Sequence, residues 1–271
     1  MAYETRVLRR DFAAMRKITA ALDNFTNAEQ FGTADLATKT SHAIFRRTWI
    51  ERFLKRGTDI AASLVVLVLG FPFFLAIALL IKLTSKGPVF FKQERVGEDG
   101  EVFALFKFRT MRTDCDDSLH REFTRNFIQG RLPEPSLDAN TGRVYKMTDD
   151  PRITAVGGFL RKTSLDELPQ FINILRGEMT IVGPRPPLPY EYECYDEWHK
   201  LRLKVRPGLT GLWQVSGRSA VPFPEMVRMD ITYIENWSLP VSYTHLRAHE
   251  TLTPIAYAVF CLKRGGGGGG G

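Results

Sequence analysis

An apolar run from Ile60 to Leu83 is the feature that most limits how this chain can fold. The run reads IAASLVVLVLGFPFFLAIALLIKL, and its only charged residue, Lys82, lies near its end. As a straight helix its 24 residues would rise about 36 Å, more than the roughly 30 Å hydrocarbon core of a bilayer. A soluble domain would have to cover such a helix with protein on every side. We therefore predict a membrane segment.

Pro72, close to Gly70, lies in the middle of this run and predicts a bend. It removes one helical hydrogen bond and its ring clashes with the carbonyl of Val68. Both flanks carry cations, which under the positive-inside rule places both on the cytoplasmic side. These cations are Arg46, Arg47, Arg52, Lys55 and Arg56 before the run, and Lys82, Lys86, Lys92 and Arg95 at its end and beyond. We predict a re-entrant helix bent at Pro72; the alternative is a kinked single span, since membrane helices tolerate proline.

Charge and cysteine content narrow the class of protein. The 37 Lys and Arg residues against 30 Asp and Glu give a net charge of +7, which favours anionic partners such as lipid headgroups, nucleotides or nucleic acid. Cys115, Cys194 and Cys261 are far apart, so they indicate neither a disulfide framework nor a thiolate zinc site. We expect a reducing location, and no signal peptide in the first fifty residues, which lack an apolar core segment.

Two short strands are predicted after the apolar run. The segment 87–97, GPVFFKQERVG, opens with turn residues and continues into a β-prone run. The segment VFALFKFRTM at 102–111 alternates between aromatic and cationic side chains in its second half. Alternation places Lys107 and Arg109 on one strand face. An ordinary half-buried strand with a solvated basic face explains the same pattern. The following segment, 114–150, is polar and predicts an insertion or lid, helical only around 118–128.

A helix carrying two adjacent carboxylates is predicted next. Leu168, Phe171, Ile172 and Leu175 recur at helical spacing, and Gly177 provides a stop. Ser164 is the expected N-cap, and with Glu167 it satisfies a capping box, which is a purely structural role for Glu167. The functional alternative is that Asp166 and Glu167, with Arg161 upstream, form a carboxylate and phosphate site at the start of the helix.

Further candidates for anion binding follow in the chain. Arg185 stands between prolines in GPRPP, which limits its backbone freedom and suits a phosphate ligand; a rigid turn with an exposed arginine is the alternative. A helix over 190–205 is predicted, with an aromatic stripe that fits either a membrane interface or a core. The glycine-rich loop RPGLTGLWQVSGR at 206–218 offers Gln214 and Arg218 but matches no known nucleotide loop.

Several motifs together resemble the bacterial sugar transferases, the monotopic polyprenyl-phosphate phosphoglycosyl transferases. The resemblance covers Lys55 to about Leu239. Its motifs, in chain order, are KRGTDI, the Pro-interrupted apolar run, GPVFFKQERVG, KFRTM, DDPRIT, RKTSLDELPQ, GEMTIVGPRP, RPGLTGLWQVSGR and YIENWSL.

The resemblance implies an enzyme that moves a hexose 1-phosphate from a UDP-sugar to undecaprenyl phosphate and so starts exopolysaccharide or O-antigen synthesis. By position, Asp166 is the nucleophile that forms a covalent phosphosugar, Glu167 binds Mg²⁺ and Arg161 binds phosphate. The further substrate contacts implied are Lys107, Arg109, Arg185, Gln214 and Arg218, and Pro72 marks the membrane bend. Inner-membrane lipid is the implied partner and nucleic acid is not; a homo-oligomer is left open.

The implied fold is an α/β (α+β) monotopic membrane protein, with a helix-break-helix in the inner membrane and a small catalytic domain of helices and short strands facing the cytoplasm. The predicted divisions are an N-terminal extension 1–54, the membrane helix 55–86, the catalytic domain 87–240 and an atypical tail 241–271. The tail departs from the family pattern, and SYTHLRAHET resembles translated sequencing-adapter read-through; we hypothesise that it is not biological. A catalytically inactive membrane scaffold for glycan assembly is the alternative function.

Overall fold

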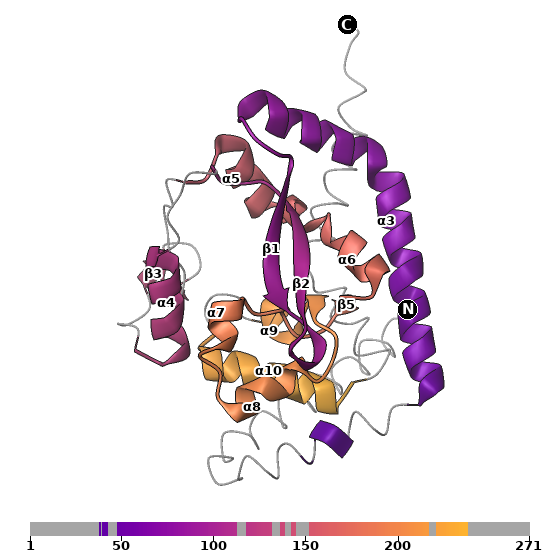
Figure 1. Cartoon of the computed structure of the whole chain (residues 1–271), viewed down its shortest axis with the longest axis vertical. Coiled ribbons are helices and arrows are strands. Elements are labelled where there is room, and N and C mark those ends of the chain that lie inside the picture. The colour runs from indigo at the N-terminus through magenta and orange to yellow at the C-terminus, as the bar shows by residue number, and fades with distance from the viewer. Residues whose placement is uncertain are drawn as a thin grey trace, which may run out of the picture.

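The computed structural model describes Thr38 and the ranges 40–42, 48–112, 118–131, 136–138, 142–144, 152–216 and 221–237. Within these ranges short helices surround a β-hairpin, and one long helix lies along their edge (Figure 1). This mixed architecture confirms the predicted fold class in its coarse form. The predicted extension 1–54 lies largely outside the described residues, and Arg218 and the tail 241–271 lie wholly outside them. The predicted lid 114–150 is described in part, and the helix expected around 118–128 is confirmed as α4, Ser118–Ile128.

The long helix α3, Trp49–Thr84, begins with a capping box. The backbone amide of Glu51 donates to Thr48 Oγ1 over 3.2 Å, and the amide of Thr48 donates to Glu51 Oε2 over 2.9 Å. The helix continues through Pro72 and is bent along its course (Figure 1), so the predicted bend is present but the predicted helix-break-helix is one continuous helix. The re-entrant course through a bilayer stays a prediction.

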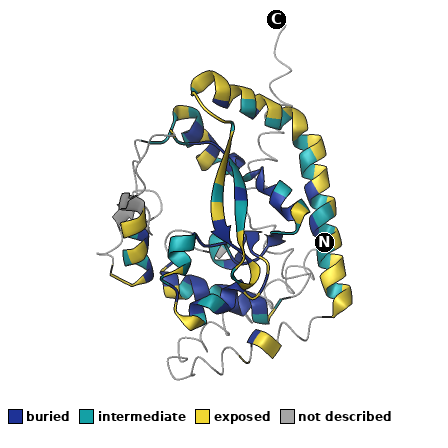
Figure 2. Ribbon diagram, viewed as in Figure 1, coloured by how far each residue is buried: buried dark blue, intermediate teal, exposed yellow. Residues whose placement is uncertain are grey.

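The outward face of α3 is apolar. Leu69 is 76% exposed, Val68 66% and Phe71 65%, and Figure 2 shows exposed residues along much of the helix. Within the described chain, α3 is the helix that is long and apolar enough to cross a membrane. A monomer in water would not present so much contiguous apolar surface, so α3 is compatible with a membrane anchor.

Strands β1, Phe90–Val96, and β2, Val102–Phe108, pair antiparallel with Phe90 opposite Phe108 and Val96 opposite Val102. Asp99 and Gly100 take positive φ values of 54° and 88° in the connecting turn. Phe108 is 1% exposed and lies 6.0 Å from Phe74 of α3 between ring centroids. The hairpin thus packs against the second half of α3.

The other helices and strands of the described chain are shorter than α3, and several of them take part in two apolar cores. In chain order they are η2 (Glu98–Gly100), α4 (Ser118–Ile128), β3 (Ser136–Asp138), β4 (Gly142–Val144), α5 (Ala155–Lys162), η3 (Leu165–Glu167), α6 (Gln170–Arg176), β5 (Thr180–Val182), α7 (Pro189–Tyr192), α8 (Glu197–Lys200), η4 (Leu201–Leu203), β6 (Gly208–Thr210), α9 (Leu212–Ser216) and α10 (Phe223–Glu235). Strands β5 and β6 pair in parallel. The larger core joins α3, the hairpin, α6 and α10, and the smaller one joins α4, η4 and α10.

The predicted single helix over 190–205 is wrong, because the structure divides this segment into α7, α8 and η4. Asp196 interrupts it with extended backbone angles, φ −71° and ψ 166°, and its amide donates to His199 Nδ1 over 3.0 Å. Tyr195 is only 7% exposed and packs in the smaller core. The buried part of the aromatic stripe therefore packs in the smaller core, as one of the two predicted alternatives stated.

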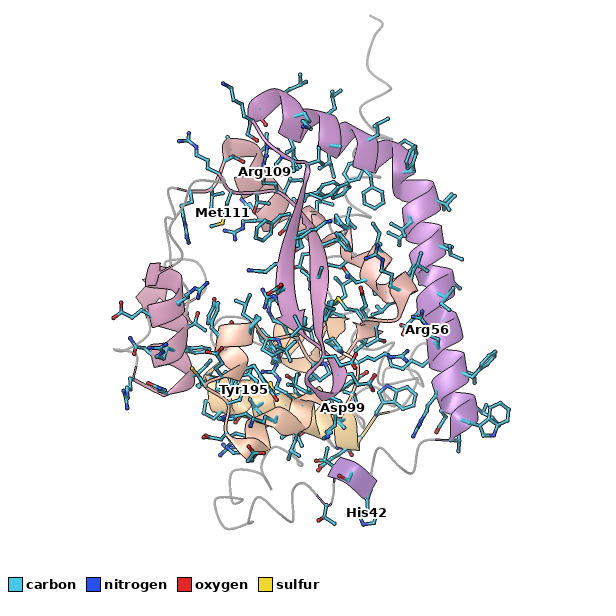
Figure 3. The ribbon with its side chains drawn as sticks, in the orientation of Figure 1. His42, Arg56, Asp99, Arg109, Met111 and Tyr195 are labelled. Atoms are coloured by element: carbon cyan, nitrogen blue, oxygen red, sulfur yellow. The ribbon has the colours of Figure 1, made fainter. Side chains whose placement is uncertain are left out.

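The first turns of α3 bind the segment that follows the carboxylate pair. Asp59 accepts from Thr180 Oγ1 over 2.6 Å and from the amide of Ile181 over 3.2 Å. Arg56 donates to the carbonyls of Ile174 and Leu175 over 2.5 and 2.8 Å, at the end of α6. Figure 3 shows Arg56 on the side of α3 that faces the other elements. We call these contacts the α3 clamp.

His199 gives the fold a predicted pH dependence. It is 4% exposed, and burial lowers its pKa to about 4, with Asp196 opposing and Arg202 adding to the shift. A folded pKa below the unfolded value means that the associated stability, complete above pH 6.5, is lost as the pH falls from about 6.5 toward 4. The variant His199→Phe should lose less thermal stability than the unmodified protein between pH 7 and pH 5, measured by unfolding in detergent. Equal losses in both proteins would contradict this role.

Candidate functional site

The carboxylate pair lies on a short 3₁₀ turn, η3, and not in the first turn of a regular helix. Ser164 precedes it in the left-handed region with φ 56°, and its side chain makes no capping bond. Pro169 follows, and α6 begins only at Gln170. The predicted capping box of Ser164 and Glu167 is therefore wrong: a left-handed N-cap residue does not have the extended geometry that capping requires. The predicted stop at Gly177 is confirmed, with φ 85°.

Apolar neighbours fix this turn in the larger core. Leu165 and Leu168 are 2% and 3% exposed and flank the two carboxylates. Asp166 is itself only 7% exposed. Burial raises the pKa of Asp166 to about 6; the charge of Glu167 raises it further, and Lys107 and Arg161 oppose the rise. A carboxyl with that pKa is mostly ionised at pH 7 and weakly solvated.

Lys107 of β2 binds the second carboxylate. Its Nζ lies 2.9 Å from Glu167 Oε1, and the two side chains are 17% and 18% exposed. Strand alternation turns Lys107 toward η3, since its neighbour Phe108 enters the core on the opposite face. One fixed cation therefore serves both carboxylates, by an ion pair with Glu167 and by its charge at Asp166.

An open cavity lies beside the pair, and its empty space, with open solvent included, amounts to about 240 Å³. Its charged lining consists of three cations and one carboxylate: Arg95, Lys107, Arg185 and Glu167. Leu105, Gln170, Pro186, Gly208 and Leu209 complete it. Excess positive charge in a partly desolvated hollow favours an anion such as a phosphate or diphosphate.

The structure brings together only part of the predicted site. Glu167, Lys107 and Arg185 line the cavity, and Asp166 is the neighbour of Glu167 in the chain. Arg161, at the end of α5, has a donor 3.9 Å from Met111 Sδ and acts on Asp166 through its charge. That these residues bind an anion stays a prediction.

Two predicted site residues, Arg109 and Gln214, lie outside the lining of this cavity. Strand β2 ends at Phe108, so strand alternation does not extend to Arg109. This guanidinium is 5% exposed and donates to the carbonyl and hydroxyl of Ser85, over 2.9 and 2.7 Å, at the end of α3 (Figure 3). Gln214 lies on α9, with its Oε1 buried and without a partner in the described chain. The structure thus places both side chains away from the cavity lining.

Pro72, the predicted membrane bend, lies within α3 as expected.

Two cavity residues, Arg95 and Gln170, were missed by the sequence reasoning. Arg95 was counted only among the cations that flank the apolar run, yet it is 6% exposed. Gln170 is 3% exposed at the start of α6. The available signal was alternation in β1, which places Gln93 and Arg95 on one face together. Alternation alone does not show that this face is covered.

A magnesium ion fits this donor set only in company with a phosphate. The described residues contain no cluster of three or more His, Cys, Asp or Glu side chains able to hold a metal. Magnesium is commonly bound through one or two carboxylates, with substrate phosphates and water completing its ligands. Glu167, which lines the cavity and follows Asp166 in the chain, is a carboxylate of this kind.

Comparison with known proteins gives a consistent family match. The family model described as bacterial sugar transferase matches residues 50–248. The exopolysaccharide production protein ExoY of Rhizobium meliloti is 45% identical over 185 residues, covering 68% of this chain and 78% of that protein.

Two longer proteins are also similar. The undecaprenyl-phosphate galactose phosphotransferase of Salmonella typhimurium is 43% identical over 190 residues. The UDP-glucose:undecaprenyl-phosphate glucose-1-phosphate transferase of Escherichia coli is 40% identical over 198 residues. Each match covers 70% of this chain and 38% of the longer protein. The family match over residues 50–248 includes the carboxylate pair, the residues that line the cavity and all but the first residue of α3.

Proposed function

This chain belongs to the bacterial sugar transferase family, and from that premise we propose that it transfers a hexose 1-phosphate from a UDP-sugar to undecaprenyl phosphate. Relatives named for undecaprenyl-phosphate galactose and glucose transfer support this choice of substrates. The observation that carries the proposal is a buried carboxylate, Asp166, which is next in sequence to the cavity residue Glu167 and is under the charge of Lys107 and Arg161. The product would start exopolysaccharide synthesis at the cytoplasmic face of the inner membrane.

The proposed reaction has two displacements at one phosphorus atom. An oxygen of Asp166 attacks the β-phosphorus of the UDP-sugar, and the bond from that phosphorus to the bridging oxygen breaks, releasing UMP. An oxygen of undecaprenyl phosphate then attacks the same phosphorus and displaces the carboxylate. Asp166 is regenerated and the lipid carries a diphosphate-linked sugar. Covalent catalysis of this kind divides one difficult transfer into two easier ones.

A carboxylate and a diphosphate are both anions and repel each other, and the cations of the site offset this repulsion. Lys107 lies at the carboxylates, and Arg95 and Arg185 lie in the same cavity. Such fixed cations stabilise the charge that develops on transferred phosphoryl oxygens. A magnesium ion held at Glu167 would add Lewis-acid neutralisation of the diphosphate.

The anchor explains how a water-borne donor and a lipid acceptor meet. The α3 clamp binds α3 to the end of α6 and to β5. Helix α6 is the helix that follows the carboxylate turn. The apolar face of α3 would place the cavity near the headgroup layer, where the phosphate of undecaprenyl phosphate lies.

The function is tested with the purified full chain in detergent. Repeated turnover, measured as UMP released from UDP-galactose or UDP-glucose, should require both Mg²⁺ and undecaprenyl phosphate, and EDTA should abolish it. Omission of the lipid should limit release to at most one UMP per protein molecule. Sustained UMP release without lipid, or none from any UDP-hexose under complete conditions, would refute the proposed function.

A further inference from the structure

The loop after β5 is held by two buried arginines from different elements. Arg95 of β1 donates through Nη1 to the carbonyl of Pro186 over 2.9 Å. Arg202 of η4 donates through Nη2 to the carbonyl of Arg185 over 3.5 Å. Their exposed fractions are 6% and 4%. The backbone that carries Arg185 is therefore bound at two consecutive carbonyls.

The charges of these two arginines are balanced differently. Arg202 forms an ion pair with the buried Asp230 of α10 and donates to Tyr195 Oη over 3.2 Å. Arg95 donates only to the carbonyl of Pro186 and, over 2.9 Å, to Gln93 Oε1, and no carboxylate pairs with it in the described chain. Its Nε is buried and unpartnered among the described residues. A guanidinium has five N–H donors, so part of its donor capacity is unused.

Arg185 adds a second cation to the same cavity. Burial, and next the charge of Arg185, lower the pKa of Arg95 to about 10, while Glu191, Tyr190 and Glu167 oppose the shift. Within the described chain the Arg185 guanidinium itself makes no hydrogen bond or ion pair. Two like charges are thus held close together in a desolvated place, an arrangement that an anion between them would relieve.

We propose that Arg95 and Arg185 form a subsite for one phosphate group, next to the carboxylate pair, in which Arg95 is a substrate-binding residue as well as a support for the loop. The natural ligand is the phosphate of the nucleotide or the phosphate of the lipid acceptor; this identification rests on the proposed function. The anion site itself is testable without turnover.

The experiment measures thermal unfolding of the full chain in detergent with inorganic diphosphate, against sodium chloride at equal ionic strength. The unmodified protein should gain on the order of 5 °C at saturation. Arg95→Gln retains a donor for the carbonyl of Pro186 but lacks the charge, and it should lose most of this gain. Arg228→Gln is the matched control, since Arg228 lies on α10 in an ion pair with Glu225, and it should retain the full gain.

A second variant keeps the test decisive if Arg95→Gln does not fold. Arg185→Gln should also lose the gain, and without ligand it should melt no lower than the unmodified protein, because it removes a repulsion. Repeating the series with UMP and with farnesyl phosphate identifies the source: the ligand whose stabilisation depends on Arg95 is the one that uses the subsite. Full gains in both variants, or no gain in the unmodified protein, would overturn the proposal.

The result separates this inference from the proposed function. A diphosphate gain that depends on Arg95, in a protein without transferase turnover, would leave the subsite standing and refute the function. If the protein turns over, but diphosphate raises the melting temperature of both arginine variants as much as that of the unmodified protein, the subsite alone would be refuted.

Discussion

Replacement of Asp166 by Asn is expected to reduce sugar-phosphate transfer by a factor on the order of 10⁴ or more, as losses of covalent nucleophiles do. The amide is nearly isosteric but cannot form the acyl phosphate. Since burial already raises the pKa of Asp166 to about 6, removal of its charge should not lower thermal stability. Multiple-turnover UMP release measures the first effect, and thermal unfolding in detergent measures the second.

The control for this change is Asp99→Asn. Asp99 is an exposed aspartate of the β1–β2 turn, paired with Lys204 over 3.0 Å, and its replacement should leave turnover unchanged. Mass spectrometry of the unmodified protein, exposed to UDP-sugar without lipid, should detect a phosphohexose adduct on the peptide that contains Asp166. An Asn variant with full turnover would exclude Asp166 as the nucleophile.

Replacement of Asp59 by Ala is expected to cost about 3 kcal/mol of unfolding free energy, within the range measured when one member of a buried charged network is removed. The change leaves the hydroxyl of Thr180 and the amide of Ile181 without their acceptor, and it leaves Lys55 without its carboxylate neighbour at 3.8 Å. The melting temperature in detergent should fall by roughly 10 °C.

Thr58→Ala is the matched control for the clamp. Thr58 precedes Asp59 in the same turn of α3, and its hydroxyl bonds only within the helix, to the carbonyl of Leu54 over 2.9 Å. Its melting temperature should stay within about 1 °C of the unmodified value, as for other surface substitutions. Equal melting temperatures for the Asp59 and Thr58 variants would show that the α3 clamp does not stabilise the fold.

Local sequence signals were sufficient for several elements. The apolar run with its proline predicted the long bent helix, alternation predicted the strand that carries Lys107, and a glycine predicted the end of α6 at Gly177. Each of these depends on neighbours within a few residues. The adjacent carboxylates and Arg185 were also recognisable, because residue type and flanking prolines are read directly from the chain.

Predictions that required knowledge of distant packing were the ones that changed. The expected helix over 190–205 is interrupted at Asp196, where the chain turns to bury Tyr195 against α10. The sequence pattern placed Arg109 on the same strand face as Lys107, but its guanidinium donates to the hydroxyl of Ser85 at the end of α3. Ser164 matched a capping pattern, yet the chain passes it in a left-handed conformation.

By itself, the sequence determined that this protein has a membrane-compatible helix and a carboxylate pair near cations, since periodicity and residue chemistry are local properties. Only the tertiary structure decided which cations share the cavity. Arg95 of β1 and Arg185 of the loop after β5 meet because the hairpin, the loop and η4 pack together. Burial and charge balance arise from contacts between segments far apart in the chain, and no local pattern specifies them.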